Sequence, residues 1–137
     1  IKLFDLGGRG RQLPVKVSSQ SDRGLVAYAT MDDSNSVAMT LINKAHGKDT
    51  MNTEVLIKLD KQLISSDAQV IFLIAPGGDI AAKSGLTLGG SPIQKDGSWH
   101  GQWSSLETSG SDNSVISVSM PPASAAIVKM LVQLSNN

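Results

Sequence analysis

Cysteine is absent from this chain of 137 residues. Its absence excludes a disulfide framework, a Cys-ligated zinc site and a thiol nucleophile. Long hydrophobic runs are also absent, because stretches such as residues 70–75 fall far short of the roughly 20 residues that span a bilayer. We therefore expect no membrane-spanning segment and no chemistry based on thiols.

The chain also lacks net charge, because 12 basic residues balance 12 acidic ones. No overall field would draw it to nucleic acid or to an anionic membrane surface, so we expect neither partner. The histidines lie in no nucleophile motif of the G-x-S-x-G type, and the Gly-rich passages lack the Gly-Lys-Ser/Thr of a phosphate loop. The composition leaves a neutral domain without an evident cofactor motif.

Short apolar runs separated by turn residues make up most of the chain. We expect strands at residues 15–18, 25–30, 37–43, 53–59, 69–75, 85–88, 99–103, 115–120 and 125–134. Side chains alternate with a period of two in the third and fourth runs, and Asp96-Gly97 is the strongest hairpin signal. This pattern predicts an all-β fold, a single-domain antiparallel β-sandwich of about eight short strands.

Helix competes with strand in only two places, residues 60–67 and 121–134. The second segment is rich in β-branched residues, which favours a buried strand. At the other end, the chain opens on an apolar run without a methionine, and we expect residues 1–12 to be a connecting segment or a first strand from a preceding domain. Residues 13–137 then form the β-sandwich.

Two passages go beyond generic strand and turn chemistry. The first runs from Leu13 to Gly47 and ends a strand in Asn43-Lys44. The second holds a Gly-Gly pair, an Asp-Gly-x-Trp turn at residues 96–99, and a Pro-x-x-Ser-Ala approach to the closing strand at residues 121–125. Together they resemble the C-terminal β-sandwich of glycoside hydrolases built on a TIM barrel, particularly the family 79 group of β-glucuronidase-like and heparanase-like enzymes.

The resemblance covers nearly the whole chain and implies an accessory domain that is not itself an enzyme. In such enzymes the catalytic carboxylates lie on the barrel, so no catalytic residue is carried over to this chain. The implied partner is a catalytic barrel of the same parent chain, braced by apolar contacts from Ile1, Leu3, Phe4 and the Trp99 hairpin. The resemblance also implies a secreted polysaccharide-degrading parent, extracellular or periplasmic, and no cofactor.

The residues that would suit catalysis have simpler interpretations. His46 and His100 are interpreted as loop and hairpin residues, although their chemistry suits proton transfer near neutrality. Glycoside hydrolysis needs two carboxyl groups about 5 to 10 Å apart, and the only glutamates are Glu54 and Glu107. Glu54 alternates with inward-facing residues and Glu107 lies in a polar stretch, so we expect no catalytic pair.

A calcium site is the one metal hypothesis that the sequence raises. Oxygen ligands are offered by Asp32, Asp33, Asn35, Asp112 and Asn113, but their spacing does not match an EF-hand loop. Aspartate and asparagine bond to their own backbone in turns, so ordinary turns are favoured and no metal is expected.

Trp99 and Trp103 carry the alternative hypothesis, an independent carbohydrate-binding module with polysaccharide as its partner. Four residues apart on an extended strand, they would share a face at a spacing of roughly 13 Å, which suits stacking on sugars. The competing interpretation is burial, in the sandwich core or against the barrel, since indole is the largest apolar surface that the chain has. We favour burial.

Overall fold

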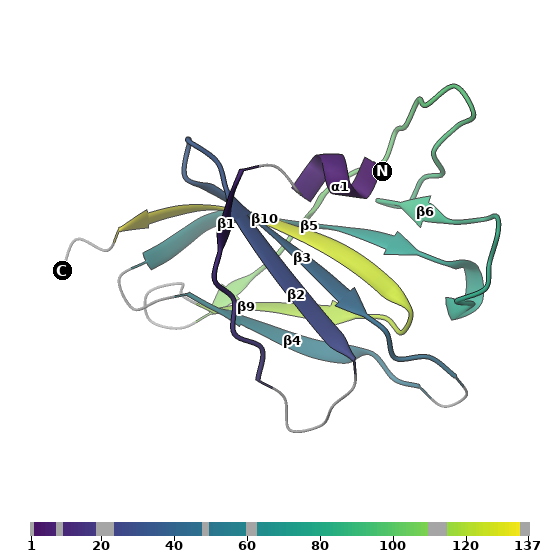
Figure 1. Cartoon of the computed structure of the whole chain (residues 1–137), viewed down its shortest axis with the longest axis horizontal. Helices are drawn as coiled ribbons and strands as arrows, with labels where there is room; N and C mark the ends of the chain where they lie inside the picture. The colour runs from purple at the N-terminus through teal and green to yellow at the C-terminus, as the bar shows by residue number, and fades with distance from the viewer. Residues whose placement is uncertain are drawn as a thin grey trace.

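The computed structural model describes residues 2–7, 10–18, 24–47, 50–59, 63–109 and 115–134. These residues form two antiparallel sheets that pack face to face, with one short helix on the outside (Figure 1). The elements in chain order are α1 (Lys2–Gly7), β1 (Arg11–Leu13), β2 (Leu25–Met31), β3 (Ser36–Asn43), β4 (Thr53–Lys58), β5 (Leu63–Ile74), the 3-10 turn η1 (Pro76–Gly78), β6 (Thr87–Leu88), β7 (Ser104–Ser105), β8 (Thr108–Ser109), β9 (Val115–Met120) and β10 (Ser124–Leu134). The predicted all-β sandwich is confirmed, with more strands than expected because several have only two or three residues.

The closing strand β10 lies at the centre of the large sheet. That sheet has the order β1-β2-β3-β10-β5-β6, with β7 also paired to β5, and the small sheet has the order β4-β9-β8. β10 pairs with β3 from Ser124 to Leu131 and with β5 over its whole length, with a register shift between Lys129 and Leu131. The sandwich therefore closes only when the end of the chain inserts between β3 and β5.

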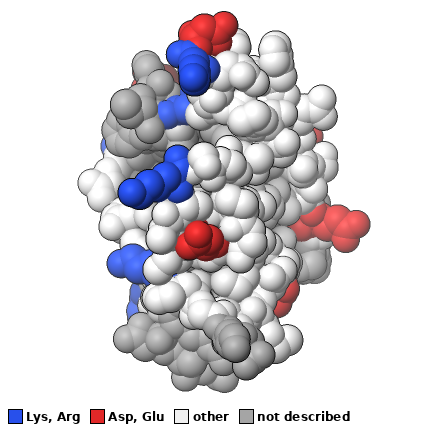
Figure 2. Space-filling view, turned by 90° about the vertical axis from the view of Figure 1, so that its right-hand side faces the viewer, with Lys and Arg blue, Asp and Glu red and all other residues white. Residues whose placement is uncertain are grey.

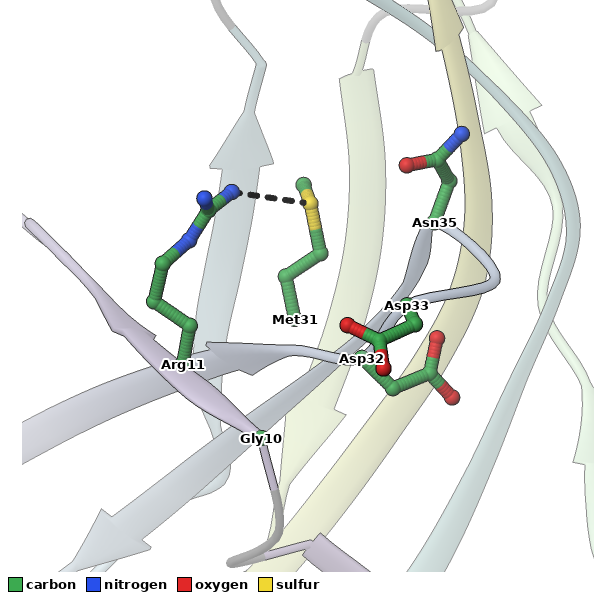
Figure 3. Close-up of a pocket in the computed structure, with 6 residues that line it drawn as sticks. All are labelled: Gly10, Arg11, Met31, Asp32, Asp33 and Asn35. Atoms are coloured by element: carbon green, nitrogen blue, oxygen red, sulfur yellow. Dashed lines mark hydrogen bonds between the residues drawn. The ribbon is translucent and has the colours of Figure 1, made fainter.

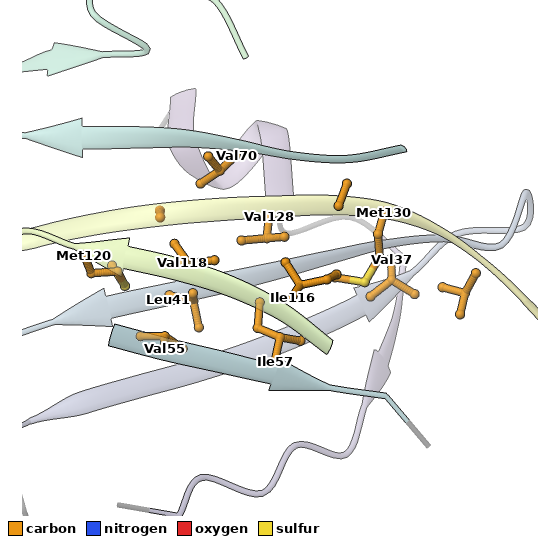
Figure 4. Packing of buried hydrophobic residues seen from close by; sticks show 13 residues of the cluster. Val37, Leu41, Val55, Ile57, Val70, Ile116, Val118, Met120, Val128 and Met130 are labelled. Atoms are coloured by element: carbon orange, nitrogen blue, oxygen red, sulfur yellow. The ribbon is translucent and has the colours of Figure 1, made fainter. Parts of the chain in front are cut away.

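The main core lies between the two sheets, and its residues follow the strand period of two. In β9, Ile116, Val118 and Met120 are buried while the intervening serines are exposed. Val55 and Ile57 of β4 point into the same layer, toward Leu41 and Val128 of the large sheet (Figure 4). Burying each such side chain contributes about 1.5–3 kcal/mol, so this layer is the main source of stability.

A second apolar cluster covers the outer face of the large sheet. Ala38, Ile71, Leu88 and Ile127 form its buried part, and α1 packs on β10 and β3 above them. Gly7 allows the close approach, because a Cβ there would lie 2.6 Å from Ile127 Cδ1. The centre of β10 is thus buried on both faces, which explains why its apolar residues occupy both phases of the strand.

Three local expectations are wrong: the sequence predicts a helix only at residues 60–67 or 121–134, and it predicts strands at residues 15–18 and 99–103. Residues 2–7 form a helix, whose last carbonyl, that of Gly7, accepts a hydrogen bond from Thr30 Oγ1 (3.1 Å). Residues 15–18 and 99–103 form no strand. The first strand ends instead before Pro14, which has no N–H to donate. Both regions considered for helix contribute to long strands, β5 and β10.

The two passages that carry the family resemblance meet in the structure. Asn43 is 1% exposed, and its Nδ2 donates to the carbonyl oxygen of Pro121 (3.0 Å) while its Oδ1 accepts from the Ala45 amide (3.1 Å). Ser124 Oγ donates to the same Pro121 oxygen (2.7 Å). This network ties the end of β3 to the turn between β9 and β10, and so joins the two sheets.

Candidate functional site

Both tryptophans pack on the outer face of the large sheet. Trp99 and Trp103 lie in the loop between β6 and β7, are half-buried, and contact the outer cluster around Leu88. Since this loop is not a strand, the roughly 13 Å spacing expected from an extended strand does not apply. The rings serve as a cover for Ile71 and Leu88.

Trp99 is held on both sides by polar contacts. Its indole Nε1 donates to the Leu88 carbonyl oxygen at 2.7 Å. The ammonium of Lys2 lies 5.5 Å from its ring centroid, within cation–π range. Gly101 lies so close that a Cβ there would overlap with the Trp99 ring and with the Leu88 carbonyl. The ring is therefore fixed by the backbone around it.

Trp103 is covered by a second cation. The Lys129 ammonium lies 5.2 Å from its ring centroid and comes from β10, next to the ring in the same face of the sheet. A sugar that stacked on this ring would have to displace the lysine. The geometry therefore favours the interpretation in which the rings are packing residues, while the carbohydrate hypothesis stays a prediction.

Of the three residues expected at a domain interface, the structure describes the side chain of Leu3 only. Leu3 is half-buried and packs, with Leu6, on the outer cluster of its own sheet. Ile1 lies outside the described residues, and the Phe4 side chain is likewise not described. Leu3 is thus already partly occupied by contacts within the domain.

The candidate catalytic residues stand on exposed positions of separate elements. Glu54 is on the outer face of β4, and Glu107 is in the link between β7 and β8. His46 Nδ1 lies 2.9 Å from the carbonyl oxygen of Lys44, two residues earlier. His100 is exposed in the loop that holds the two tryptophans. These four residues thus come from four separate segments of the chain.

Asp32, Asp79 and Asp96 each accept a hydrogen bond from the backbone amide two residues later in their turns. Asp32 Oδ1 accepts from the amides of Ser34 (2.8 Å) and Ser36 (3.0 Å). Asp112 and Asn113 lie outside the described residues. Within the described part of the chain, no group of three or more His, Cys, Asp and Glu side chains is placed to hold a metal ion, and no helix there is long and apolar enough to cross a bilayer.

A hollow of about 520 Å³ lies at the end of β2, beside this turn. It is lined by Gly10, Arg11, Met31, Asp32, Asp33 and Asn35 (Figure 3). Arg11 Nη2 contacts Met31 Sδ at 3.6 Å, and Asp32 is already used by its own turn. The hollow offers one cation, Arg11, and the carboxylates of Asp32 and Asp33, all on exposed side chains.

Exposed apolar side chains gather in one segment of the chain. Between residues 74 and 93, which contain η1 and β6, lie four of the exposed large hydrophobic residues: Ile74, Ile80, Leu86 and Ile93. We call this segment the β6 end. Figure 2 faces this end of the molecule and shows a surface with few, scattered charges.

The β6 end also lies close to where the chain begins. Figure 1 shows the start of α1 beside β6, and the Lys2–Trp99 contact places it against the loop that follows β6. The start of α1 therefore lies near the β6 end, whose exposed charged residues include Asp79 and Lys83. Isolated isoleucines and leucines among the turn residues at 80–93 are the signal in the sequence that could have indicated these exposed positions.

Comparisons with known proteins agree with the fold. A similar solved structure is the crystal structure of CelM2, a bifunctional glucanase-xylanase protein from a metagenome library, with a TM-score of 0.52 and 21% sequence identity. The match covers 80% of this chain and 16% of that chain, so the fold of this chain resembles a small part of that protein. No protein-family model matches the chain, and no curated protein matches it.

Proposed function

We propose that this chain is the non-catalytic C-terminal accessory domain of a secreted, polysaccharide-degrading glycoside hydrolase and that it braces the catalytic barrel of its parent. The observation that carries the proposal is the structural match, because the corresponding part of the glucanase-xylanase is 16% of that enzyme. The finer assignment to a family 79-like parent rests on the two passages around Asn43 and Pro121.

The bracing surface in this proposal is the β6 end. Ile80 is 63% exposed, and Leu86 and Ile93 are also exposed. Contact with a neighbouring domain would remove these side chains from water, and full burial of each contributes about 1.5–3 kcal/mol. α1 starts beside β6 (Figure 1), so a domain that precedes it would lie near the same surface.

The first test is the coding sequence upstream of Ile1. A (β/α) barrel with two glutamates at strand ends supports the proposal, and a surface-protein architecture without a barrel contradicts it. The second test uses that barrel, expressed apart from this chain. Adding the chain should raise the melting temperature of the barrel, and the chain alone should leave glucosides and glucuronides uncleaved.

Two variants then test the surface. Ile80→Asp combined with Leu86→Asp should weaken the binding of barrel to chain at least tenfold, since about 1.4 kcal/mol corresponds to tenfold in affinity. Met51→Asp is the matched control, because Met51 is 77% exposed and precedes β4, outside the β6 end. Equal binding by all three proteins would contradict bracing through this surface.

The alternative, sugar binding by Trp99 and Trp103, predicts a different result. Titration with soluble polysaccharides would quench tryptophan fluorescence to saturation, and Lys129→Ala would strengthen binding by uncovering the Trp103 ring. The bracing proposal predicts no saturable quenching in either protein.

A further inference from the structure

β4 is a long strand with a partner on only one side. It pairs with β9 from Thr53 to Lys58, and it is at the end of the small sheet. Among the described residues, no other backbone hydrogen bond reaches it. The other terminal strands of the two sheets, β1, β6 and β8, have two or three residues each. A free edge of six residues presents unpaired N–H and C=O groups that another strand can use.

The side chains of this edge are unusual for an exposed strand. Val55 and Ile57 point into the core, while Glu54, Leu56 and Lys58 point to solvent. Leu56 is 59% exposed, and its paired residue on β9 is Ser117, which offers little apolar contact. Its two charged neighbours have opposite sign.

We infer that the β4 edge binds the β4 edge of a second copy of this chain, antiparallel, in a dimer with Leu56 at the two-fold axis. An isologous dimer brings identical strands together in opposite directions. Residues that lie directly opposite each other must point to the same side of the joined sheet, so they must be an even number of positions apart in β4. The two-fold axis therefore passes through a residue of β4 and not between two residues. Each choice of centre gives a different set of pairs.

The side chains select one centre. With Leu56 on the axis, Glu54 of each copy lies opposite Lys58 of the other, Val55 lies opposite Ile57, and the two exposed leucines meet. Centring on Val55 or Ile57 leaves Leu56 opposite a charged residue. Centring on Glu54 or Lys58 places like charges directly opposite each other, which is unfavourable. Charge and apolar complementarity thus favour the same arrangement, in which the two small sheets join into one of six strands.

This interface is separate from the β6 end and does not depend on the proposed function. A six-residue edge buries less area than a standard stable interface, so the dimer should be weak and dependent on concentration. Sedimentation equilibrium of the whole chain, from about 10 μM to 1 mM, should show a shift from 14.4 kDa toward twice that mass. A chain that stays monomeric over this range overturns the proposal.

Charge reversal tests the register. Glu54→Lys places lysine opposite Lys58, and Lys58→Glu places glutamate opposite Glu54, so each variant alone should dimerise at least tenfold more weakly. A one-to-one mixture of the two variants should recover association, because each charge then faces its opposite. The double variant should also recover it. Glu107→Lys is the control for net charge, since Glu107 is exposed outside β4, and it should dimerise like the unmodified chain.

Leu56→Lys provides a second probe, because it places two cations together at the axis. It should abolish association while leaving the circular dichroism spectrum and melting temperature of the monomer unchanged, since Leu56 is outside the core. Association that persists in Leu56→Lys, or that is equal in the single variants and in their mixture, overturns the proposal.

Discussion

Gly101 occupies a position where any side chain would collide with its neighbours. A Cβ there would overlap with the Trp99 ring and with the carbonyl oxygen of Leu88. That carbonyl belongs to β6, which is paired with β5, so the ring has more freedom to move than the backbone. Gly101→Ala should therefore displace Trp99 from the outer cluster and break its 2.7 Å hydrogen bond to Leu88.

The cost of Gly101→Ala can be estimated from these two losses. Overpacking typically costs about 1–3 kcal/mol, and a lost hydrogen bond costs about 1 kcal/mol. We expect a loss of about 3 kcal/mol in the free energy of unfolding, a large share of the roughly 5–15 kcal/mol of an ordinary domain. At this chain length each kcal/mol lowers the melting temperature by about 4 °C, so the expected decrease is about 12 °C.

Urea denaturation and tryptophan emission measure this prediction. The emission of Gly101→Ala should shift to the red as Trp99 becomes exposed. Gly97→Ala is the matched control, because Gly97 has a φ of 86° but no atom within 4 Å of the place where the new methyl group would lie, and it should cost only about 1–2 kcal/mol of backbone strain. In a Trp99→Leu background, Gly101→Ala should cost clearly less. An equal cost in both backgrounds would refute the collision with the ring.

Two further predictions concern polar contacts. Asn43→Asp keeps an acceptor for the Ala45 amide but loses the donor to Pro121 and buries a charge. Urea denaturation at pH 7 should therefore show a decrease of about 3 kcal/mol or more in the free energy of unfolding. The decrease should be smaller at pH 4, where the buried carboxyl is more readily protonated, and a larger decrease at pH 4 would contradict the prediction. Hydrogen bonds from the Ser98 hydroxyl and amide lower the pKa of the exposed Asp96 carboxyl below its usual 3.8. Because the pKa is lower in the folded chain, the stabilisation is complete above the usual value and is lost as the pH falls through the folded value. The NMR shift of the Ser98 amide should therefore titrate with a midpoint below pH 3.8, and this titration should be absent in Asp96→Asn.

Most of the sandwich could be predicted from the sequence, because its long strands have the period of two or a dense β-branched run. β2, β3, β4, β9 and β10 agree with the expected ranges to within one or two residues. The Asp96-Gly97 turn is also present, with Gln94 and Ser98 joined by a backbone hydrogen bond of 2.9 Å. In each of these cases the sequence pattern reflects local chemistry, either a strand with one buried face or a tight turn.

The outer layer could not be predicted in the same way. α1 has six residues, and helices shorter than about 12 residues are marginal on their own. It depends on tertiary contacts, the close approach of Gly7 to Ile127 and the hydrogen bond from Thr30. The tryptophan loop depends on the same sheet face, which exists only once β10 lies between β3 and β5. Neither contact leaves a periodic signal in the sequence.

The positions of the residues that carry the family resemblance show that the resemblance concerns the fold. Asn43 and Ser124 both bond to the Pro121 carbonyl, at the corner where β3 meets the β9–β10 turn. These residues close the sandwich, so their recurrence would preserve a fold and not a reaction. The bracing and dimer proposals instead use two surfaces that this corner does not include, the β6 end and the β4 edge. The separation is measurable: Asn43→Asp should impair both barrel binding and self-association through lost stability, whereas Ile80→Asp should impair only the first and Leu56→Lys only the second.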